Sequence, residues 1–417
     1  MKRWTTADIP DLSGRAAVVT GANAGLGLET ARVLAEHGAE VVLACRDFDK
    51  AKRAADRIRA GDRRARVTTV RLDLASLASV REAADEIRSA CPQLALLINN
   101  AGVMEVPYER TEDGFELTFA TNHLGHFALT GLVLDRLLAT PGSRIVTLSS
   151  LGHLDGAMNF DDLQSEGGYR PDEAYGQSKL ANLLFTYELD RRLRAAGAPT
   201  IALASHPGVV CTNLFRTRSK LEQTLISPRM RVINFWAVQS VQMGALPTLR
   251  AAVDPSARGG EYYGPRRRSY TRFTGYPDLA ESSERSHDAA DQARLWEVSE
   301  RLTGVTYRIT AGPPYPEGLC PQPARVTATT TVICGPRSSR RPQSSSGRAG
   351  SAASPWRRPA DASVSRSAPR TPTSPIVTTC SPQLRCGPAR CSTARWCRRS
   401  AGTRSPRNGS PPLPAAT

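Results

Sequence analysis

The stretch Arg15-Ala-Ala-Val-Val-Thr-Gly-Ala-Asn-Ala-Gly-Leu-Gly27 decides the fold of this chain. The apolar run Arg15–Thr20 predicts a buried strand, and the glycine-rich residues after it lead into a helix predicted over Leu26–His37. Glycines between a strand and a helix let the backbone approach a phosphate, whose charge the helix N-terminus stabilises. The stretch therefore indicates a dinucleotide-binding turn, with an ordinary glycine-rich turn as the alternative.

The alternation of strand and helix continues outward from this stretch. Further strands are predicted at Glu40–Ala44, Arg66–Leu72, Leu94–Ile98, Arg144–Leu148, Thr200–Ser205 and Glu261–Tyr263. Helices are predicted over Asp49–Ala60, Ser76–Ala90, Glu112–Ala139, Glu173–Ala196, Val241–Ala252 and His287–Leu302. Continuous apolar strands, each followed by a helix, favour a parallel sheet covered on both faces. The expected fold class is α/β: a Rossmann-type, doubly wound parallel sheet in a single domain, with its ligand at the carboxyl ends of the strands.

The last quarter of the chain differs in composition from the rest. Residues 311–417 contain 16 arginines, no lysine and only two acids, so they carry +14 of the formal net charge of +16. They also hold 18 of the 30 prolines and show no apolar periodicity, so they cannot bury enough surface to offset the entropy of ordering. We expect a domain over residues 1–304 and an Arg-, Pro- and Ser-rich tail over 305–417. Residues 221–238 have a mixed pattern that assigns them to no element. The tail is either disordered or translated out of frame.

Charge, cysteine usage and hydropathy limit the partners and the cellular location that we expect for this protein. The arginine-rich tail lacks a helical pattern and ordered aromatic residues, so no specific nucleic-acid partner is expected. Cys45, Cys91 and Cys211 are scattered through the body and suggest reduced thiols. The N-terminus lacks the apolar core of a signal peptide, and no run of ~18 apolar residues occurs. A cytoplasmic protein with no membrane span is expected.

The stretch Tyr175-Gly-Gln-Ser-Lys179 carries the clearest chemistry. It lies in a predicted helix, where positions four apart share a face, so the phenol and the ammonium can lie together. A tyrosine with the usual pKa of ~10 is a poor base near neutrality, and a neighbouring cation favours its phenolate. The pair can therefore take a proton from an alcohol or deliver one to a carbonyl. An ordinary surface pair on a helix is the alternative for this spacing alone.

Several motifs in order resemble the short-chain dehydrogenase/reductase family. The glycine-rich turn is similar to its TGxxxGxG signature, Asn99-Asn-Ala-Gly102 is similar to its NNAG motif, and Tyr175 to Lys179 has its YxxxK spacing. The stretches FATNHLGHFALT at 119–130 and HPGVV at 206–210 resemble the retinol dehydrogenase-like branch. The resemblance covers about residues 12–304.

The resemblance implies roles for four catalytic residues. Tyr175 would transfer the proton, and Lys179 would lower its pKa and bind the ribose. Ser150 would hydrogen-bond the substrate oxygen, with the adjacent Ser149 as the other candidate. Asn122 would support a water relay to the lysine.

The resemblance also implies the coenzyme contacts. These are Gly21, Asn23, Gly25, Leu26, Gly27, Arg46, Asp73, Leu74, Asn99, Ala101, Gly102, Tyr175, Lys179, Pro207, Gly208, Val210 and Thr212. Arg46 follows the second strand, where an NAD enzyme usually has an acid, and its planar fork can bind a 2′-phosphate. The second basic position in the glycine-rich loop is absent, and Asp47 follows Arg46 directly. We therefore expect NADP(H), with NAD(H) less favoured.

The expected function is an NADP(H)-dependent oxidoreductase that transfers a hydride between nicotinamide and an alcohol or carbonyl carbon of a lipophilic small molecule. A non-catalytic NADP(H)-binding sensor or interaction protein on the same fold is the alternative. His123 and His126 have no obvious acidic or cysteine partner, so no metal site is expected. The expected partner is the small-molecule substrate, and the family resemblance also allows a homo-oligomer.

Overall fold

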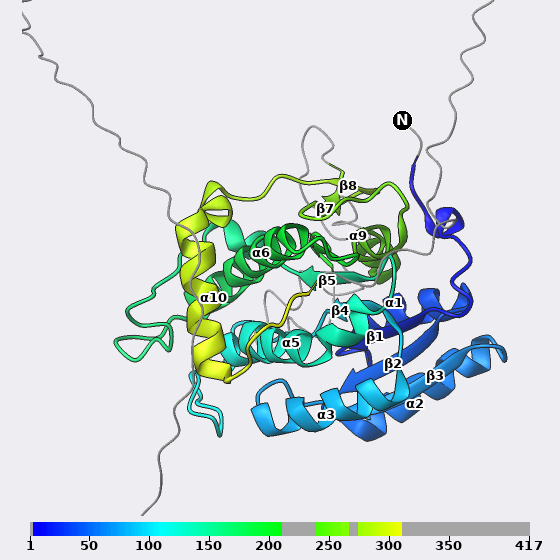
Figure 1. The fold of residues 1–417 in the computed structure, drawn as a ribbon, viewed down its shortest axis with the longest axis horizontal. Coiled ribbons are helices and arrows are strands. Elements are labelled where there is room, and N and C mark those ends of the chain that lie inside the picture. Colours follow the sequence, from blue (N-terminus) through cyan, green and yellow to red (C-terminus); the bar gives the residue numbers. More distant parts are fainter. Residues whose placement is uncertain (1–2, 211–238, 267–273, 311–417) are drawn as a thin grey trace, which may run out of the picture. The chain divides into compact units, whose positions relative to one another are not determined.

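The computed structural model describes residues 3–210, 239–266 and 274–310, all within the compact unit Met1–Thr327. Figure 1 shows their arrangement. The unassigned stretch 221–238 and most of the expected tail lie outside the described residues.

The described residues form one eight-stranded sheet with the order β3-β2-β1-β4-β5-β6-β7-β8. Its strands are β1 (Ala16–Thr20), β2 (Glu40–Cys45), β3 (Arg66–Arg71), β4 (Leu94–Asn99), β5 (Arg144–Leu148), β6 (Ile201–Ser205), β7 (Tyr262–Pro265) and β8 (Pro277–Leu279). Neighbouring strands from β3 to β7 pair in parallel, and β8 pairs antiparallel with β7. The fold is therefore the expected doubly wound α/β sheet, with one further strand, β8, that the apolar pattern did not predict.

Helices cover both faces of the sheet (Figure 1). The principal helices are α1 (Gly25–Glu36), α2 (Phe48–Gly61), α3 (Leu77–Ala90), α5 (Gly125–Leu138), α6 (Pro171–Ala195), α9 (Val241–Val253) and α10 (Ala289–Thr303). Short turns lie at η1 (Thr6–Asp8), α4 (Leu117–Phe119), η2 (Ala120–Leu124), η3 (Leu151–Leu154) and η5 (Glu284–His287). Both faces of each central strand are therefore buried.

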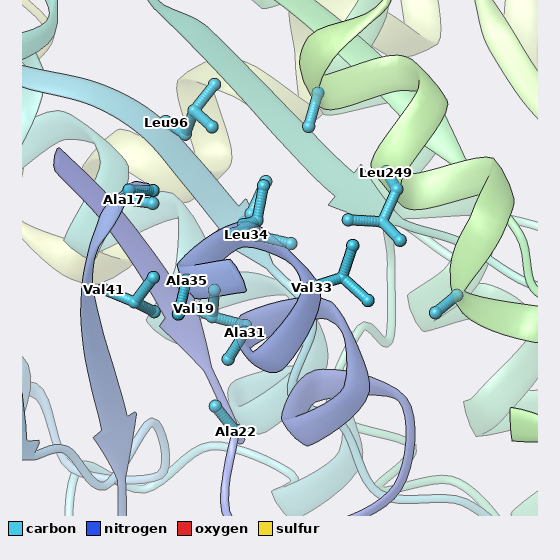
Figure 2. Packing of buried hydrophobic residues seen from close by; sticks show 14 of the residues in the cluster. Ala17, Val19, Ala22, Ala31, Val33, Leu34, Ala35, Val41, Leu96 and Leu249 are labelled. Atoms are coloured by element: carbon cyan, nitrogen blue, oxygen red, sulfur yellow. The ribbon is translucent and has the colours of Figure 1, made fainter. Parts of the chain in front are cut away.

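Alternate residues of the central strand β1 supply two separate cores. Ala17 and Val19 belong to the cluster that contains Leu249 of α9 (Figure 2). Val18 points to the opposite face and belongs to the cluster that contains Phe127 of α5. Since successive side chains of a strand point to opposite faces, burial on both sides requires an unbroken apolar run. This requirement explains why the strands could be predicted from the sequence.

The helix predicted over Glu112–Ala139 begins later and is interrupted. The Glu116 side chain is buried and accepts hydrogen bonds from the backbone amides of Thr118 and Phe119, both at 2.6 Å. The chain then makes the π-helical turn η2 before it continues as α5. The prediction was wrong over residues 112–116, because the buried carboxylate caps the helix there.

The described chain continues to pack after α10. The Tyr307 hydroxyl donates a 2.6 Å hydrogen bond to the Phe127 carbonyl of α5. Its ring centre lies 4.5 Å from that of Trp296 in α10. The core on this face therefore includes residues beyond Gly304.

Among the described residues, no helix combines the length and the apolar character that crossing a membrane requires.

A glycine at the start of α5 allows this helix to pack closely against the loop that follows β3. A Cβ atom at Gly125 would overlap the Leu74 carbonyl oxygen and lie 2.9 Å from the Leu74 Cβ. We expect Gly125→Ala to lower the free energy of unfolding by about 1–3 kcal/mol, because backbone cannot move aside easily. Urea denaturation measures this change.

Gly61→Ala is the matched control. Nothing lies within 4 Å of a Cβ atom at Gly61, the last residue of α2. Alanine is the better helix former, so this variant should be unchanged or more stable by up to about 1 kcal/mol. Equal effects of the two substitutions would contradict the proposed close approach.

Candidate active site

The cavity lies where the strand order of the sheet reverses. β1 is flanked by β2 and β4, so the connections after β1 and β4 lead to opposite faces and leave a crevice at their carboxyl ends. A cavity of about 960 Å³ opens there. It is lined by the turn after β1, by residues after β2, β3, β4, β5 and β6, and by the first turns of α6.

The glycine-rich turn forms a wall of backbone. Gly21 and Gly25 have positive φ angles of 65° and 58°. A Cβ atom at Gly21 would lie 2.9 Å from the Ala101 Cβ. A Cβ atom at Gly27 would overlap the Asn100 side-chain nitrogen and lie 2.7 Å from the Gly21 carbonyl oxygen. The turn therefore needs glycine at these positions, and its exposed backbone next to the start of α1 fits a pyrophosphate group.

Most residues expected to contact the coenzyme line this cavity. They are Gly21, Asn23, Gly25, Leu26, Gly27, Arg46, Asp73, Leu74, Ala101, Gly102, Tyr175, Lys179, Pro207, Gly208 and Val210. Asn99 does not line it: its side chain is buried, and its side-chain nitrogen donates a 3.0 Å hydrogen bond to the Thr130 hydroxyl of α5. Asn100 takes the place beside the cavity. Thr212 lies outside the described residues.

Charged side chains gather after β2, at one end of the cavity. Arg46, Asp47 and Lys50 all line it. Asp47 caps α2 by accepting a 2.9 Å hydrogen bond from the Lys50 amide, and its other oxygen lies 2.7 Å from the Lys50 ammonium. The pKa of Asp47 is therefore lowered, chiefly by Lys50. Lys50, in the first turn of α2, was not among the coenzyme contacts expected from the sequence.

The two serines after β5 have different surroundings. The Ser149 hydroxyl is buried and donates a 2.8 Å hydrogen bond to the Lys179 carbonyl oxygen. The Ser150 hydroxyl accepts a 3.2 Å hydrogen bond from the Gly152 amide, and the residue is only half-buried at the cavity. Ser150 is therefore the better placed of the two to bind a substrate oxygen.

Tyr175 and Lys179 lie close together on α6. The Lys179 ammonium lies 5.6 Å from the centre of the Tyr175 ring and 3.3 Å from the Leu148 carbonyl oxygen. Burial lowers the pKa of Lys179 to about 8. The tyrosine ring reaches this place because residue 152 is glycine, where a Cβ atom would lie 3.1 Å from a ring carbon. At neutral pH a buried cation therefore faces the phenol and favours its phenolate.

Asn122 lies in the π-helical turn η2, behind the cavity wall. Its side chain accepts a 2.8 Å hydrogen bond from the Val103 amide and donates one of 3.0 Å to the Val103 carbonyl. It also donates a 2.9 Å hydrogen bond to the Ser178 hydroxyl of α6. The asparagine thus joins the loop after β4 to the helix that carries Tyr175 and Lys179.

The histidines beside Asn122 do not form a metal site. His123 is buried and lies 2.9 Å from the Ser299 hydroxyl. His126 is buried and lies 2.9 Å from the Thr20 hydroxyl. Within residues 3–210, 239–266 and 274–310, no three His, Cys, Asp or Glu side chains cluster closely enough to hold a metal ion.

Several known proteins are similar to this chain in sequence and in fold. The family model for short chain dehydrogenase matches residues 15–223. The chain is 42% identical to retinol dehydrogenase 13 of Homo sapiens over 297 residues, which cover 70% of this chain and 86% of that protein. It is 41% identical to retinol dehydrogenase 12 of Mus musculus, over 73% of this chain and 90% of that one.

A crystal structure of an uncharacterised protein from Mycobacterium paratuberculosis is similar as well, with 42% identity and a TM-score of 0.61. The match covers 74% of this chain and all of that one. The chain therefore belongs to the short-chain dehydrogenase/reductase family of oxidoreductases, in the branch that contains the retinol dehydrogenases.

Proposed function

We propose that this protein is an NADP(H)-dependent oxidoreductase that interconverts an alcohol and a carbonyl group in a lipophilic small molecule. The observation that carries the proposal is one cavity lined by the backbone cradle after β1, by Arg46, and by Ser150, Tyr175 and Lys179. A bound NADPH would supply the hydride. The side chains of this protein would then bind the substrate oxygen and move the proton.

Three side chains would handle the oxygen and its proton. The Ser150 hydroxyl hydrogen-bonds the carbonyl oxygen and stabilises the charge that develops on it. The Tyr175 hydroxyl donates its proton to that oxygen during reduction and takes it back during oxidation. The Lys179 ammonium, 5.6 Å from the tyrosine ring centre, stabilises the phenolate left behind. Asn122 holds the loop at Val103 and the helix at Ser178 in place around them.

The cavity lining favours an uncharged, lipophilic substrate. Apolar side chains also line the cavity, at Met104, Val106, Leu151, Val209 and Val210. Carboxylates also line the cavity, at Glu105, Asp155, Asp172 and Glu173. Negative charges close to the site would repel an anionic substrate. An aldehyde or ketone is therefore favoured over a keto acid with the same carbon skeleton.

Turnover tests this proposal directly. NADPH oxidation is followed with a panel of aldehydes and ketones, each paired with its keto-acid analogue. We expect turnover with the neutral compounds, and a loss of about 10²–10⁴-fold in kcat for Tyr175→Phe, because the proton donor is removed. Tyr187→Phe is the matched control, since Tyr187 is on the same helix and its hydroxyl pairs with Ser282.

A Tyr175→Phe protein with full turnover would contradict the assignment of the proton donor. NADPH binding without turnover on any compound of the panel would favour the non-catalytic sensor instead.

The charges after β2 support NADP(H) over NAD(H). Asp47 is engaged with the α2 amide and with Lys50, whereas Arg46 has no ion-pair partner among the described residues. Arg46 can therefore bind a 2′-phosphate through its planar fork. Lys50 also lines the cavity, and its ion pair with Asp47 offsets the negative charge of that carboxylate beside Arg46.

We expect Arg46→Ala to raise the KM for NADPH by roughly 10–100-fold, since a hydrogen bond to a charged group contributes about 1.5–3 kcal/mol. The KM for NADH should change little, because NADH has no 2′-phosphate. Steady-state kinetics with both coenzymes measures the difference. Arg53→Ala, an exposed arginine of α2 that does not line the cavity, is the control. Equal changes for the two coenzymes would argue against a phosphate contact.

The buried charge of Lys179 should lower the free energy of unfolding. Its pKa of about 8 in the folded protein lies below the ordinary 10.5, so the folded state disfavours the charged form. The resulting cost, on the order of 3 kcal/mol, is fully present below pH 8 and disappears as the pH rises to 10.5. We therefore expect coenzyme-free Lys179→Met to unfold at higher denaturant concentration than wild type at pH 7, while losing activity.

The stability difference between Lys179→Met and wild type should shrink as the pH rises from 8 to 10.5. Lys52→Met, at an exposed position of α2, should show no such pH dependence. A difference that is constant from pH 7 to 10.5 would mean that the charge of Lys179 is not the cause.

A further inference from the structure

A buried hydrogen-bonded chain runs through His126, from the coenzyme cradle to the π-helical turn. The Thr20 hydroxyl oxygen, at the end of β1, accepts hydrogen bonds from the amides of Asn100 and Ala101, both at 2.9 Å. The same oxygen lies 2.9 Å from Nε2 of His126. Nδ1 of His126 lies 3.0 Å from the carbonyl oxygen of Asn122.

The donors and acceptors along this chain have one consistent assignment. A carbonyl oxygen can only accept, so Nδ1 of His126 must carry the hydrogen that it shares with Asn122. Burial and the nearby Lys179 charge lower the pKa of His126 to about 4, so the ring is neutral and Nε2 is an acceptor. The Thr20 hydroxyl therefore donates to Nε2 at 2.9 Å, a shorter contact than its 3.4 Å contact to the Ile98 carbonyl oxygen, and uses its lone pairs for the two amides. His126 therefore fixes the orientation of the Thr20 hydroxyl and of the Asn122 carbonyl.

The two ends of this chain both hold the wall of the cavity. Asn100 and Ala101 line it directly. At the other end, Asn122 binds the Val103 backbone, which lines it too. Thr20 and Asn122 are 0% exposed and His126 is 1% exposed, so water cannot replace a missing partner easily. An apolar residue at position 126 would remove both contacts of the ring and leave the Thr20 hydroxyl only its longer contact to the Ile98 carbonyl oxygen, at 3.4 Å.

We propose that His126 is a positioning residue that orients the coenzyme-binding turn at Asn100–Ala101 through Thr20 and orients the carbonyl of Asn122 through its other ring nitrogen. Its two ring nitrogens thus serve two different parts of the site. The proposal rests on the proposed function for the catalytic role of Asn122, but its coenzyme half does not require turnover.

Two amide substitutions separate the two hydrogen bonds. His126→Asn keeps a donor near the Nδ1 position and loses the contact to Thr20, whereas His126→Gln can keep an acceptor near the Nε2 position and loses the donor to Asn122. One neutral hydrogen bond contributes about 1 kcal/mol, or roughly 5-fold. We expect His126→Asn to raise the Kd for NADPH about 3–10-fold with little change in kcat. We expect His126→Gln to lower kcat about 3–10-fold with little change in that Kd.

The Kd is measured by titrating NADPH fluorescence without substrate, and kcat by NADPH oxidation with the best carbonyl of the panel. His123→Asn and His123→Gln are the matched controls, because His123 is equally buried but its ring contacts Ser299 of α10. These control variants should lower the melting temperature without separating an effect on the Kd for NADPH from an effect on kcat. A simple packing role for His126 predicts that its two variants lower affinity, kcat and stability together, and that result would overturn the proposal.

Thr20 provides an independent test. Thr20→Val removes the hydroxyl at similar volume and should weaken NADPH binding at least as much as His126→Asn, because the Asn100 and Ala101 amides also lose their acceptor, whereas Thr20→Ser should restore it. The double variant Thr20→Val/His126→Asn should bind NADPH no worse than Thr20→Val alone, because the hydrogen bond that His126→Asn removes is already missing. Additive losses would overturn the coenzyme half of the proposal. This measurement still decides the coenzyme half if His126→Gln fails to fold.

Failure of the proposed function looks different. If Tyr175→Phe turns over like wild type, the catalytic assignment fails whatever the His126 variants do. If Tyr175→Phe is inactive while both His126 variants match wild type in Kd and kcat, the assignment of His126 fails alone.

Discussion

The close contact between the turns that follow β1 and β4 is the constraint on which the site depends. Gly21 and Gly27 leave no room for a Cβ atom against Ala101 and Asn100. The Asn100 side chain donates a 2.7 Å hydrogen bond to the Thr20 carbonyl across this contact. Because the two turns are held together, the crevice that a doubly wound sheet leaves at its switch point has a fixed wall of backbone. Larger residues here would separate the turns.

The fold could be predicted from the sequence because its strands are buried on both faces and therefore read as unbroken apolar runs. β8, Pro277–Leu279, was missed because a three-residue edge strand with a proline and an aspartate has no such run. The break in the helix predicted over Glu112–Ala139 was missed as well. Apolar periodicity does not encode a buried carboxylate cap or a π-helical turn.

Site residues could be predicted where their type and their spacing in the sequence indicate their role. They were harder to predict where the role depends on contacts that only the fold creates. Tyr175 and Lys179 share a helix face, so their spacing was sufficient. The partnership of Thr20 with His126 joins residues 106 positions apart, and no local pattern indicates it. Sequence reasoning considered His126 only as a metal ligand. Its actual partners become visible once β1 and α5 are placed side by side.

Two of the buried histidines of this protein each contact two segments of the chain. His123, His126, His153 and His206 are all buried, and burial lowers the pKa of each. His153, for example, lies 2.5 Å from the Ser150 carbonyl and accepts a 3.2 Å hydrogen bond from the Ser283 amide. The rings of His126 and His153 each contact two segments of the chain, and burial disfavours the charged form of both.

The packing of Tyr307 has a practical consequence for anyone who shortens this chain. A protein that ends at Gly304 would keep every element of the sheet and all of α10. It would nevertheless leave the Phe127 carbonyl without its donor and uncover one side of Trp296. An expression boundary after Thr310 retains both contacts and is the safer choice for crystallisation.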